Sequence, residues 1–562
     1  MTLDAPEGLF TRAGDLDDAR MPESAQRQKS SSRWRVLHKR SRCVAGSLIL
    51  GLFAGGAHAQ TSADTLQSLQ QQIRELQLRL EQLQSQVTSQ AQQLPTAARN
   101  ATTAAAAGAP PAPHVTQSPT NRFSIESADG QYSIGLTGRL HLDFGGYPSY
   151  HQDSHITTPS DLNDGVNARR ARIGVTGKFA GDWSYTFIYD FGGSNDNGPA
   201  APNSGAAAAA TGGIENAFVT YNGLYKGPVP LAFDAGYQDV PFTLEEATSS
   251  NDIMFMERSS AQVVATEFNA GDFRSALGVR SNNDVYWAGL YLTGPVSGSS
   301  HTIGAGGEPY GMFARASVQA LTGADYSLHI GADVADLVHP ATSTTGLEAL
   351  TLSDRPELRL DPTSLLTTTI APTVAGSTAG QVLGGQVYGI ETAAGYRNLF
   401  AQSEAYAYRV DRRNLPDNTF YGGYLEGSWT VTGEHRNYIP ATGAYSGIIP
   451  TRPFSLSKGA WGAWELAARI SYVSLNDNFD PAAGNGVSTH TNSVEGGRQT
   501  IYGLGVNWYL NTNMRIMFDY LHAVVKKEGG VTTTGAACAA ATCGQQIGAS
   551  VDEVAGRLQL AF

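Results

Sequence analysis

Arginines that alternate with apolar residues are the main candidates for chemistry in this 562-residue sequence. The most regular members of the set are Arg139, Arg170, Arg172, Arg315, Arg469, Arg515 and Arg557, and the less regular ones are Arg280, Arg355 and Arg359. Successive side chains of a strand point to opposite faces, so these guanidinium groups share the face opposite the apolar residues. A guanidinium group forms paired hydrogen bonds with phosphate oxygens. The pattern predicts a polar surface that can bind anions, but it does not fix the sign of an ion selectivity.

The motifs that mark common enzyme active sites are absent from the sequence. It has no nucleophile elbow, no P-loop, no complete GxGxxG and no histidines at zinc-binding spacing. Glu465 and Arg469 could form a catalytic pair, but a salt bridge on the polar face is favoured. The run 476–480 could bind calcium, and a solvated loop is favoured there as well. We expect no enzymatic activity, no cofactor and no metal, and an outer-membrane phospholipase or protease is the weaker alternative.

The final strand has one apolar and one polar face. Its apolar positions are Val554, Leu558 and Leu560, and the polar side chains between them include Glu553, Arg557 and Gln559. The sequence then ends in an aromatic residue, Phe562. Lipid on one side of a strand and water on the other impose this alternation, which is typical of an outer-membrane β-barrel.

Residues 1–59 carry the features of an export leader. Basic residues between Arg33 and Arg42 precede an apolar run at 44–54, and Ala57 and Ala59 follow it. The run is too short to span a membrane as a helix, so we expect export with cleavage after Ala59. Residues 1–32 lack any such pattern, which suggests a misassigned start codon.

Residues 60–94 contain a heptad repeat. Apolar residues recur at spacings of three and four, at Leu66, Leu69, Ile73, Leu76, Leu80, Leu83, Val87 and Leu94, with Gln90 as the one polar position. The repeat predicts a coiled coil, which we place in the periplasm, and a helix packed on the rest of the chain is the alternative. Mixed residues at the a positions do not discriminate between two and three strands. Residues 95–120, which are rich in Ala, Thr and Pro, are interpreted as a linker.

Residues 121–562 alternate between strand-like segments and insertions rich in Gly, Ser and Asn. The clearest strands are at 132–144, 170–179, 183–191, 310–320, 326–334, 463–472, 502–510 and 514–520, and long insertions are at 192–213, 294–308, 340–350, 475–498 and 529–549. The 63 glycines and 24 tyrosines suit a twisted sheet with aromatic girdles. At about 28 residues per strand and connection, the region holds about sixteen strands. We predict an all-β fold, a transmembrane antiparallel β-barrel with short turns at one end and long loops at the other.

The cysteines allow one disulfide outside the leader. Cys538 and Cys543 are separated by four residues in a stretch rich in Gly, Ala and Thr. In an oxidising compartment these two residues could close a small loop, and two free thiols are the alternative.

Several motifs of the barrel region resemble the phosphate-selective porin O and P family. The strongest match is PFTLEEATSSNDIMFMER at Pro241–Arg258. Further matches, in the family's order, are RRARIGVTGKFAGDWSY (169–185), RPE (355–357), TGEHRNYIP (432–440), GAWELAARISYVSLND (462–477), GLGVNWYLNTNMRIMFDY (503–520) and RLQLAF (557–562). A leading coiled coil is also common in this family. The resemblance implies a sixteen-stranded, homotrimeric barrel in the outer membrane, whose third extracellular loop folds into the lumen.

The resemblance also implies roles for residues near a pore constriction. The 241–258 segment would lie there, which makes Asp239, Glu245, Glu246 and Arg258 candidates for the constriction loop. Phosphate-selective members use lumen-facing arginines that lead to lysines near the constriction, and a stack of moderate sites lets an anion enter and leave. This sequence departs from that pattern, because residues 237–241, where relatives often carry a lysine, contain none.

The charge of the sequence also bears on selectivity. Outside residues 1–59 it has 29 basic and 44 acidic residues, and only five of the basic ones are lysines. Acidic extracellular loops could supply much of this negative charge. We expect an outer-membrane channel for phosphate or other small anions that contacts lipid and lipopolysaccharide and binds no nucleic acid. A general small-solute porin is the main alternative, then a cation-preferring channel, and a structural protein or adhesin would show no ion conductance.

Overall fold

The computed structural model describes residue 79 and residues 112–116, 123–152, 161–192, 213–227, 229–296, 307–342, 346–372, 377–478, 493–528 and 547–562. The chain divides into two units, Met1–Ala101 and Thr102–Phe562. The predicted leader, the predicted coiled coil apart from the helical Arg79, and both Cys538 and Cys543 lie outside the described residues. None of the helices in the described part of the chain combines the length and the hydropathy that a membrane span requires.

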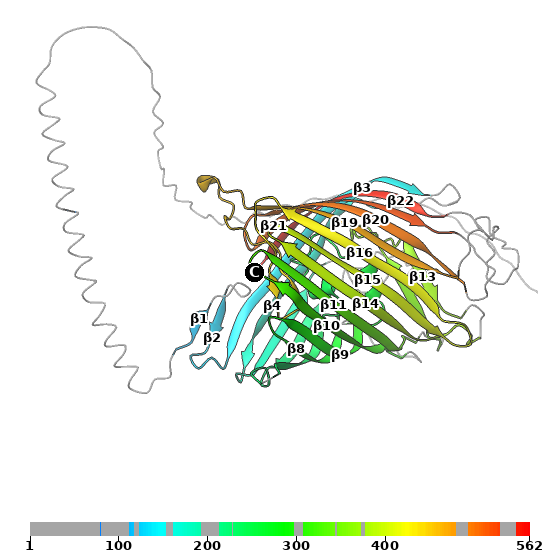
Figure 1. Cartoon of the computed structure of the whole chain (residues 1–562), viewed down its shortest axis with the longest axis horizontal. Helices are drawn as coiled ribbons and strands as arrows, with labels where there is room; N and C mark the ends of the chain where they lie inside the picture. Colours follow the sequence, from blue (N-terminus) through cyan, green and yellow to red (C-terminus); the bar gives the residue numbers. More distant parts are fainter. Residues whose placement is uncertain are drawn as a thin grey trace, which may run out of the picture. The chain divides into compact units, whose positions relative to one another are not determined.

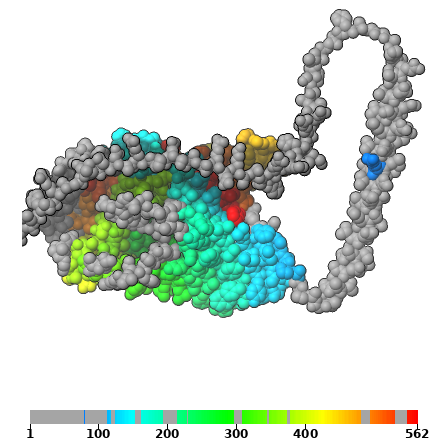
Figure 2. Space-filling model, turned by 180° about the vertical axis from the view of Figure 1, so that it is seen from behind, coloured from blue at the N-terminus to red at the C-terminus, as the bar shows by residue number. Residues whose placement is uncertain are grey.

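Sixteen antiparallel strands of the second unit form a closed barrel. The strands are β3 (Ser133–Gln152), β4 (Gly165–Phe179), β5 (Trp183–Asp190), β6 (Gly213–Tyr221), β7 (Leu231–Asp239), β8 (Phe273–Asn282), β9 (Tyr286–Val296), β10 (Tyr310–Thr322), β11 (Tyr326–His339), β14 (Val382–Tyr396), β15 (Leu399–Arg412), β16 (Asn418–Thr430), β19 (Ala463–Asp477), β20 (Val494–Tyr509), β21 (Met514–Lys526) and β22 (Ala549–Ala561). Each strand pairs with the next, and β22 pairs with β3 to close the wall. Figure 1 shows β22 in red beside β3 in cyan, and Figure 2 shows the red end of the chain next to the cyan strands from the opposite side. The predicted barrel and its strand number are confirmed.

The two faces of the wall follow the alternation of the sequence. On β22, Val554 is 51% exposed on the outside, whereas Arg557 is fully buried on the inside. The other strands behave in the same way, with apolar residues outward and polar residues inward, because a barrel in a membrane meets lipid on its outer face. Aromatic side chains gather where the strands meet the short turns, at Trp183, Tyr221, Tyr326, Tyr396, Trp429, Trp464 and Trp508.

The connections at the two ends of the barrel differ in length, with one exception that the sequence pattern did not predict. Most connections at the end that carries Phe562 are short, such as the turn between β4 and β5, so this end faces the periplasm. The connection between β16 and β19 lies at the same end and spans residues 431–462. It contains β17 (Tyr438–Ile439), β18 (Ala444–Tyr445) and the 3₁₀ helix η1 (Leu456–Lys458). The expectation of short turns throughout that end was therefore wrong for this connection.

Three connections supply the material inside the barrel. From the loop end, residues 240–272 contribute the helices α2 (Leu244–Ala247) and α3 (Ser260–Thr266). The connection after β11 contributes the hairpin β12 (Leu350–Asp354) and β13 (Leu366–Ile370). The segment 431–462 enters from the turn end. A buried apolar cluster joins the first segment to the wall, and its members include Val240, Phe242, Phe268, Trp287, Phe313 and Tyr408.

A small hairpin precedes the barrel. It consists of β1 (His114–Thr116) and β2 (Ser124–Glu126), and β2 pairs with the first residues of β3. β1 lies within the segment 95–120 that we interpreted as a linker. Phe562 occupies the next position along the same edge of β3, where its backbone exchanges two hydrogen bonds with Gly138.

Candidate functional site

The loop 240–272 has local sequence signals for its two short helices. Thr243 caps α2, where its side-chain oxygen accepts a hydrogen bond from the Glu246 amide at 3.0 Å. Ser259 caps α3 in the same way through the Gln262 amide at 3.4 Å. Both pairs have a hydroxyl residue followed three positions later by Glu or Gln, which is the spacing of a capping box. The helices therefore begin where the sequence supplies a cap.

The residues between the two helices form turns and bends, most of them are buried, and side chains of the wall are hydrogen-bond partners of their backbone carbonyls. Met254, Phe255 and Met256 are each about 1% exposed. Arg515 Nη1 donates to the Ile253 carbonyl at 2.8 Å, and Asn507 Nδ2 donates to the Met254 carbonyl at 2.9 Å. A buried carbonyl without a partner would destabilise the loop, so inward-facing polar side chains of the wall act as its hydrogen-bond partners.

Glu257 lies at the centre of a buried ion network. Its carboxylate is 2.8 Å from Arg169 Nε, 2.7 Å from Arg557 Nη2 and 3.9 Å from Arg170 Nη1. Arg557 also pairs with Asp143 at 2.6 Å. Burial opposes ionisation of Glu257, but Arg169, Arg170 and Arg557 outweigh it and hold the pKa of Glu257 well below its usual range. Two of the predicted arginines, Arg170 and Arg557, thus fix the loop in place.

Arg169 is a member of this network that the sequence alternation missed. Strict alternation would turn it outward, since its neighbour Arg170 faces inward. The pairing of β3 with β4 shifts between His141 and Leu142, because His141 faces Arg170 while Leu142 faces Ala168. The extra residue is a β-bulge, which turns Arg169 inward beside Arg170. The adjacent pair of arginines was the only signal of this feature in the sequence.

Arg469 contacts three carboxylates, none of which is the one expected. It pairs with Glu357, and it lies 3.6 Å from both Glu245 and Glu426. Glu465 pairs with Arg436 at 2.8 Å instead. The predicted bridge between Glu465 and Arg469 was therefore wrong, because loops that enter the lumen bring closer partners than the neighbouring position on the same strand.

Three further predicted arginines face the interior as components of ion pairs. Arg172 Nε lies 2.8 Å from Asp190, and Arg280 Nε lies 3.0 Å from Asp234. Arg315 Nε lies 2.9 Å from Glu391. Each pair cancels one positive charge, so these arginines contribute less to the field of the lumen than their number suggests.

Arg355 and Arg359 do not belong to the wall. Both lie in the connection after β11, next to the hairpin of β12 and β13. Arg355 is buried, and Arg359 is half-buried with its Nε lacking a hydrogen-bond partner among the described residues. The connection that contains the RPE motif folds inward and carries both arginines into the barrel.

The constriction-loop candidates are close to one another. Arg258 Nε lies 3.2 Å from Glu246, and it also donates to the Glu245 carbonyl at 3.1 Å. The Glu245 carboxylate accepts from the Ser259 hydroxyl at 2.8 Å. Asp239, at the end of β7, has one buried oxygen without a partner among the described residues. Glu245, Glu246 and Arg258 are therefore in direct contact within the loop 240–272.

A cavity of about 770 Å³ lies at the turn end, below the loop 240–272. Its charged lining residues are Arg139, Arg172, Arg280, Arg515, Asp234, Asp239, Glu246 and Asp252. Within the described residues, neither Arg139 nor Arg515 has a carboxylate within 4.0 Å. Arg139 donates instead to the Ser249 and Ser250 hydroxyls. We call this cavity the vestibule.

The segment 431–462 forms part of the vestibule wall and was missed by the sequence reasoning. Trp287 Nε1 donates to the Ala441 carbonyl at 3.1 Å, and Arg315 donates to the Thr442 and Gly443 carbonyls at 2.9 and 2.7 Å. The TGEHRNYIP motif and the long gap between strand-like segments were the available signals. Neither indicated that the segment would fold inward.

This chain is similar to a family of known proteins over most of its length. The family model described as phosphate-selective porin O and P matches residues 134–562. Porin O of Pseudomonas aeruginosa is 26% identical over 420 residues, which cover 72% of this chain and 86% of that protein. An uncharacterised protein of Caulobacter vibrioides is also 26% identical, over 74% of each chain. Among solved structures, outer-membrane expressed OmpT of Vibrio cholerae covers 80% of this chain and all of its own, at 11% identity and a TM-score of 0.41. An anion-selective porin from Comamonas acidovorans covers 77% of this chain and all of its own, at 12% identity and a TM-score of 0.41.

Proposed function

Because this chain belongs to the phosphate-selective porin O and P family, it is an outer-membrane channel, and we propose that it passes small anions, phosphate among them, by passive diffusion. Its activity is then transport and not catalysis. The main alternative is a general small-solute porin without preference for anions.

The observation that carries the anion proposal is the vestibule. Arg139 and Arg515 line it without a carboxylate within 4.0 Å in the described part of the chain. Arg139 is partly exposed, so its guanidinium group is available to an ion in the cavity. The N–H groups of a guanidinium match phosphate oxygens, and a partly hydrated site of this kind binds an anion weakly enough to release it.

Ion pairing reduces the negative charge of the vestibule. Of its four acidic residues, Asp234 pairs with Arg280 and Glu246 pairs with Arg258, whereas Asp239 and Asp252 form no ion pair within 4.0 Å among the described residues. Paired carboxylates contribute little net field, so the arginines without a close carboxylate have a larger effect than the overall charge suggests. The lysines line no part of the vestibule: Lys178, Lys226, Lys458 and Lys526 are exposed elsewhere, and the half-buried Lys527 donates to the Thr367 carbonyl at 2.6 Å.

We also propose that the chain forms a homotrimer with its coiled coil in the periplasm. The heptad repeat at 66–94 supports this, and so does the pairing of β2 with the turn end of β3, since the preceding chain then leaves the barrel on the periplasmic side. In this organisation residues 1–59 are a leader, 60–94 the coiled coil and 95–120 the connection to the barrel. The apolar outer face would contact lipid, and the loop end would contact lipopolysaccharide.

Reversal potentials in a KCl gradient, measured across planar bilayers with and without added phosphate, test the function. We expect anion selectivity and block of the chloride current by phosphate. Arg139→Ala should shift the reversal potential toward cations and weaken the block. Arg139→Lys is the matched control, because it keeps the charge and loses only the fork, so the potential should stay near that of the unmodified protein. A channel without ion preference whose potential is the same in Arg139→Ala would favour the general porin.

A further inference from the structure

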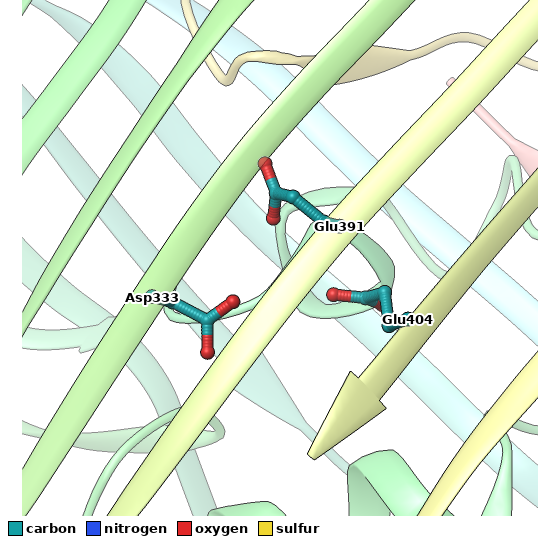
Figure 3. A group of neighbouring side chains, drawn as sticks. All are labelled: Asp333, Glu391 and Glu404. Carbon is teal, nitrogen blue, oxygen red and sulfur yellow. The ribbon is translucent and has the colours of Figure 1, made fainter.

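The inner wall carries a cluster of three carboxylates away from the vestibule. Asp333 lies on β11, Glu391 on β14 and Glu404 on β15, and all three side chains are at most 5% exposed. One oxygen of each carboxylate lies within 4.8 Å of the others. Figure 3 shows the carboxyl groups of Asp333 and Glu404 turned toward each other. The cross-strand register creates this arrangement, because Glu391 faces Glu404 and Asp333 faces Gly389.

Two of the three carboxylates already have protein partners. Glu391 is 2.9 Å from Arg315 Nε and 2.8 Å from His329 Nε2. Glu404 accepts hydrogen bonds from the Leu244 and Glu245 amides at 2.8 and 2.9 Å, which are the first amides of α2. These contacts hold both side chains in fixed positions on the inner face.

Asp333 is different, because both of its oxygens are buried without a hydrogen-bond partner among the described residues. The hydroxyl of Tyr406 is also buried without a partner there, and Tyr406 faces Gly389 on the side opposite Asp333. An unpartnered buried carboxylate next to two others is strongly destabilised unless a cation or a proton accompanies it. Two separate side chains therefore indicate a missing partner at the same place.

Glycines provide the space that the carboxyl groups occupy. A Cβ on Gly389 would lie 2.2 Å from Asp333 Oδ1, and a Cβ on Gly331 would lie 2.3 Å from Glu391 Oε1. Any larger residue at either position would displace the carboxylate beside it. The backbone of β11 and β14 thus accommodates the cluster.

The charge and spacing of the cluster fit a divalent cation. Three carboxylates and the one guanidinium group of Arg315 sum to two negative charges when His329 is neutral. All the available ligands are oxygens, which favour a hard cation. Calcium–oxygen distances of about 2.3–2.6 Å place opposed ligand oxygens about 5 Å apart, whereas magnesium would require a tighter arrangement. We propose that Asp333, Glu391 and Glu404 bind one Ca²⁺ ion inside the barrel.

Such an ion would connect the wall to the loop 240–272. Asp333 belongs to β11, while Glu404 holds the first turn of α2 through two amides. The ion bridges these elements and fixes the start of the loop. The site is separate from the anion selectivity proposed above, so either proposal can fail without the other.

Terbium luminescence tests the site, because Tb³⁺ replaces Ca²⁺ and is excited through nearby tyrosines such as Tyr406. Full-length protein in detergent is treated with EGTA and titrated with Tb³⁺, and then with Ca²⁺ or Mg²⁺ as competitor. We expect a luminescent site in each chain that Ca²⁺ empties at lower concentration than Mg²⁺. Asp333→Asn should weaken binding about tenfold or more. Glu553→Gln is the matched control, since Glu553 is equally buried and has two unpartnered oxygens in the described structure, and it should leave binding unchanged.

Several results would overturn the proposal. They are the absence of tyrosine-excited luminescence, an equal affinity of the Asp333→Asn protein, and displacement by Mg²⁺ as efficient as that by Ca²⁺. If Asp333→Asn does not fold, crystals of the unmodified protein soaked in Tb³⁺ decide the matter. An anomalous peak between the three carboxylates supports the site, and its absence means that Asp333 holds only a proton.

Discussion

Two segments enter the lumen from opposite ends, and the wall holds them in different ways. Residues 240–272 contact side chains of β3, β4, β15, β19, β20, β21 and β22, for example through Arg557 and Glu404. The polar contacts of residues 431–462 with the wall fall on β9, β10 and β11, and on β19 and β20. The first segment is thus fixed around most of the circumference and the second along two shorter arcs.

The contacts of the two segments show what the inward-facing arginines do in this barrel. Arg469, Arg515 and Arg557 donate to backbone carbonyls of the loop 240–272 and hold it in place. Arg172, Arg280 and Arg315 instead pair with carboxylates of the wall. Arg139, which is partly exposed and lies beside hydroxyl groups, is better placed to act on a permeating ion. On the proposed function, structural anchoring and ion guidance would therefore be carried by different members of one set.

The largest expected effect follows from breaking the network around Glu257. Arg557→Ala leaves both oxygens of Asp143 without their guanidinium partner inside the barrel. Loss of one partner from a buried ion pair costs about 3–5 kcal/mol. We expect a loss of this size in the free energy of unfolding in urea, or failure to give the heat-modifiable band of a folded barrel.

Arg409→Ala is the control for this prediction. Arg409 pairs with Asp417 at 2.6 Å on the exposed outer rim, where water and salt screen an ion pair, so we expect no measurable loss in the free energy of unfolding. Equal losses for the two variants would mean that the network around Glu257 does not anchor the loop.

The second prediction concerns two variants, in each of which part of one segment is replaced by a linker. Replacing residues 438–446 with a Gly/Ser linker removes β17 and β18, and with them part of the vestibule lining. We expect the barrel to assemble and its single-channel conductance to rise roughly twofold, because the pore widens while the wall stays intact. The same replacement of residues 249–257 should prevent assembly, since it removes Glu257. If the barrel assembles without residues 249–257 but not without residues 438–446, then the segment 431–462, and not the loop 240–272, is the one that assembly requires.

The wall and the loop 240–272 could be predicted from the sequence for a physical reason. Lipid outside the barrel and water inside it impose a period of two on every strand. Residue type alone therefore shows that Arg557 faces the interior and Val554 the outside. The continuous motif at Pro241–Arg258 marked the loop through its resemblance to the family. These are local signals, which a single sequence contains.

The partners of the arginines could not be predicted in the same way. Arg469 and Glu465 share a strand face, but loops from elsewhere in the chain provide closer carboxylate and guanidinium groups. Arg169 turned inward through a bulge whose one local signal, the adjacent pair of arginines, does not show which of the two faces inward. The sequence analysis expected no metal. The three residues of the proposed calcium site, Asp333, Glu391 and Glu404, are brought together by the cross-strand register and not by their spacing along the chain. Assignments of this kind require the three-dimensional pairing.

The third prediction concerns pH and the fixed character of the loop 240–272. Burial raises the pKa of Glu267, just after α3, to about 7 from its ordinary value of 4.5, although Arg274 opposes the shift. The folded state therefore keeps a proton that the unfolded chain loses, so this contribution to stability is greatest below pH 4.5 and disappears as the pH rises to 7. Glu267→Gln should remove that dependence and stabilise the barrel above pH 7 by about 1–2 kcal/mol, a value reduced because the side chain is only partly buried. Urea unfolding at several pH values measures this, and parallel pH curves for the two proteins would contradict it.

The smallest effect is expected from removing a neutral ion pair in the vestibule. Arg280 and Asp234 lie 3.0 Å apart and both line that cavity, so the double variant Arg280→Met, Asp234→Asn changes no net charge. The Thr220 and Tyr291 hydroxyls now donate to Oδ1 and Oδ2 of Asp234, and the Asn amide can accept from Thr220 through its oxygen and donate to the Tyr291 hydroxyl oxygen through its nitrogen. Because only charges without a close counter-charge act over a screening length of about 8–10 Å, the reversal potential in a KCl gradient should stay near that of the unmodified protein. Arg139→Ala removes a charge that has no carboxylate within 4.0 Å among the described residues, so it should shift the reversal potential. If the neutral double variant shifts the potential as much as Arg139→Ala does, paired arginines also guide ions, and the separation between anchoring and guiding residues does not hold.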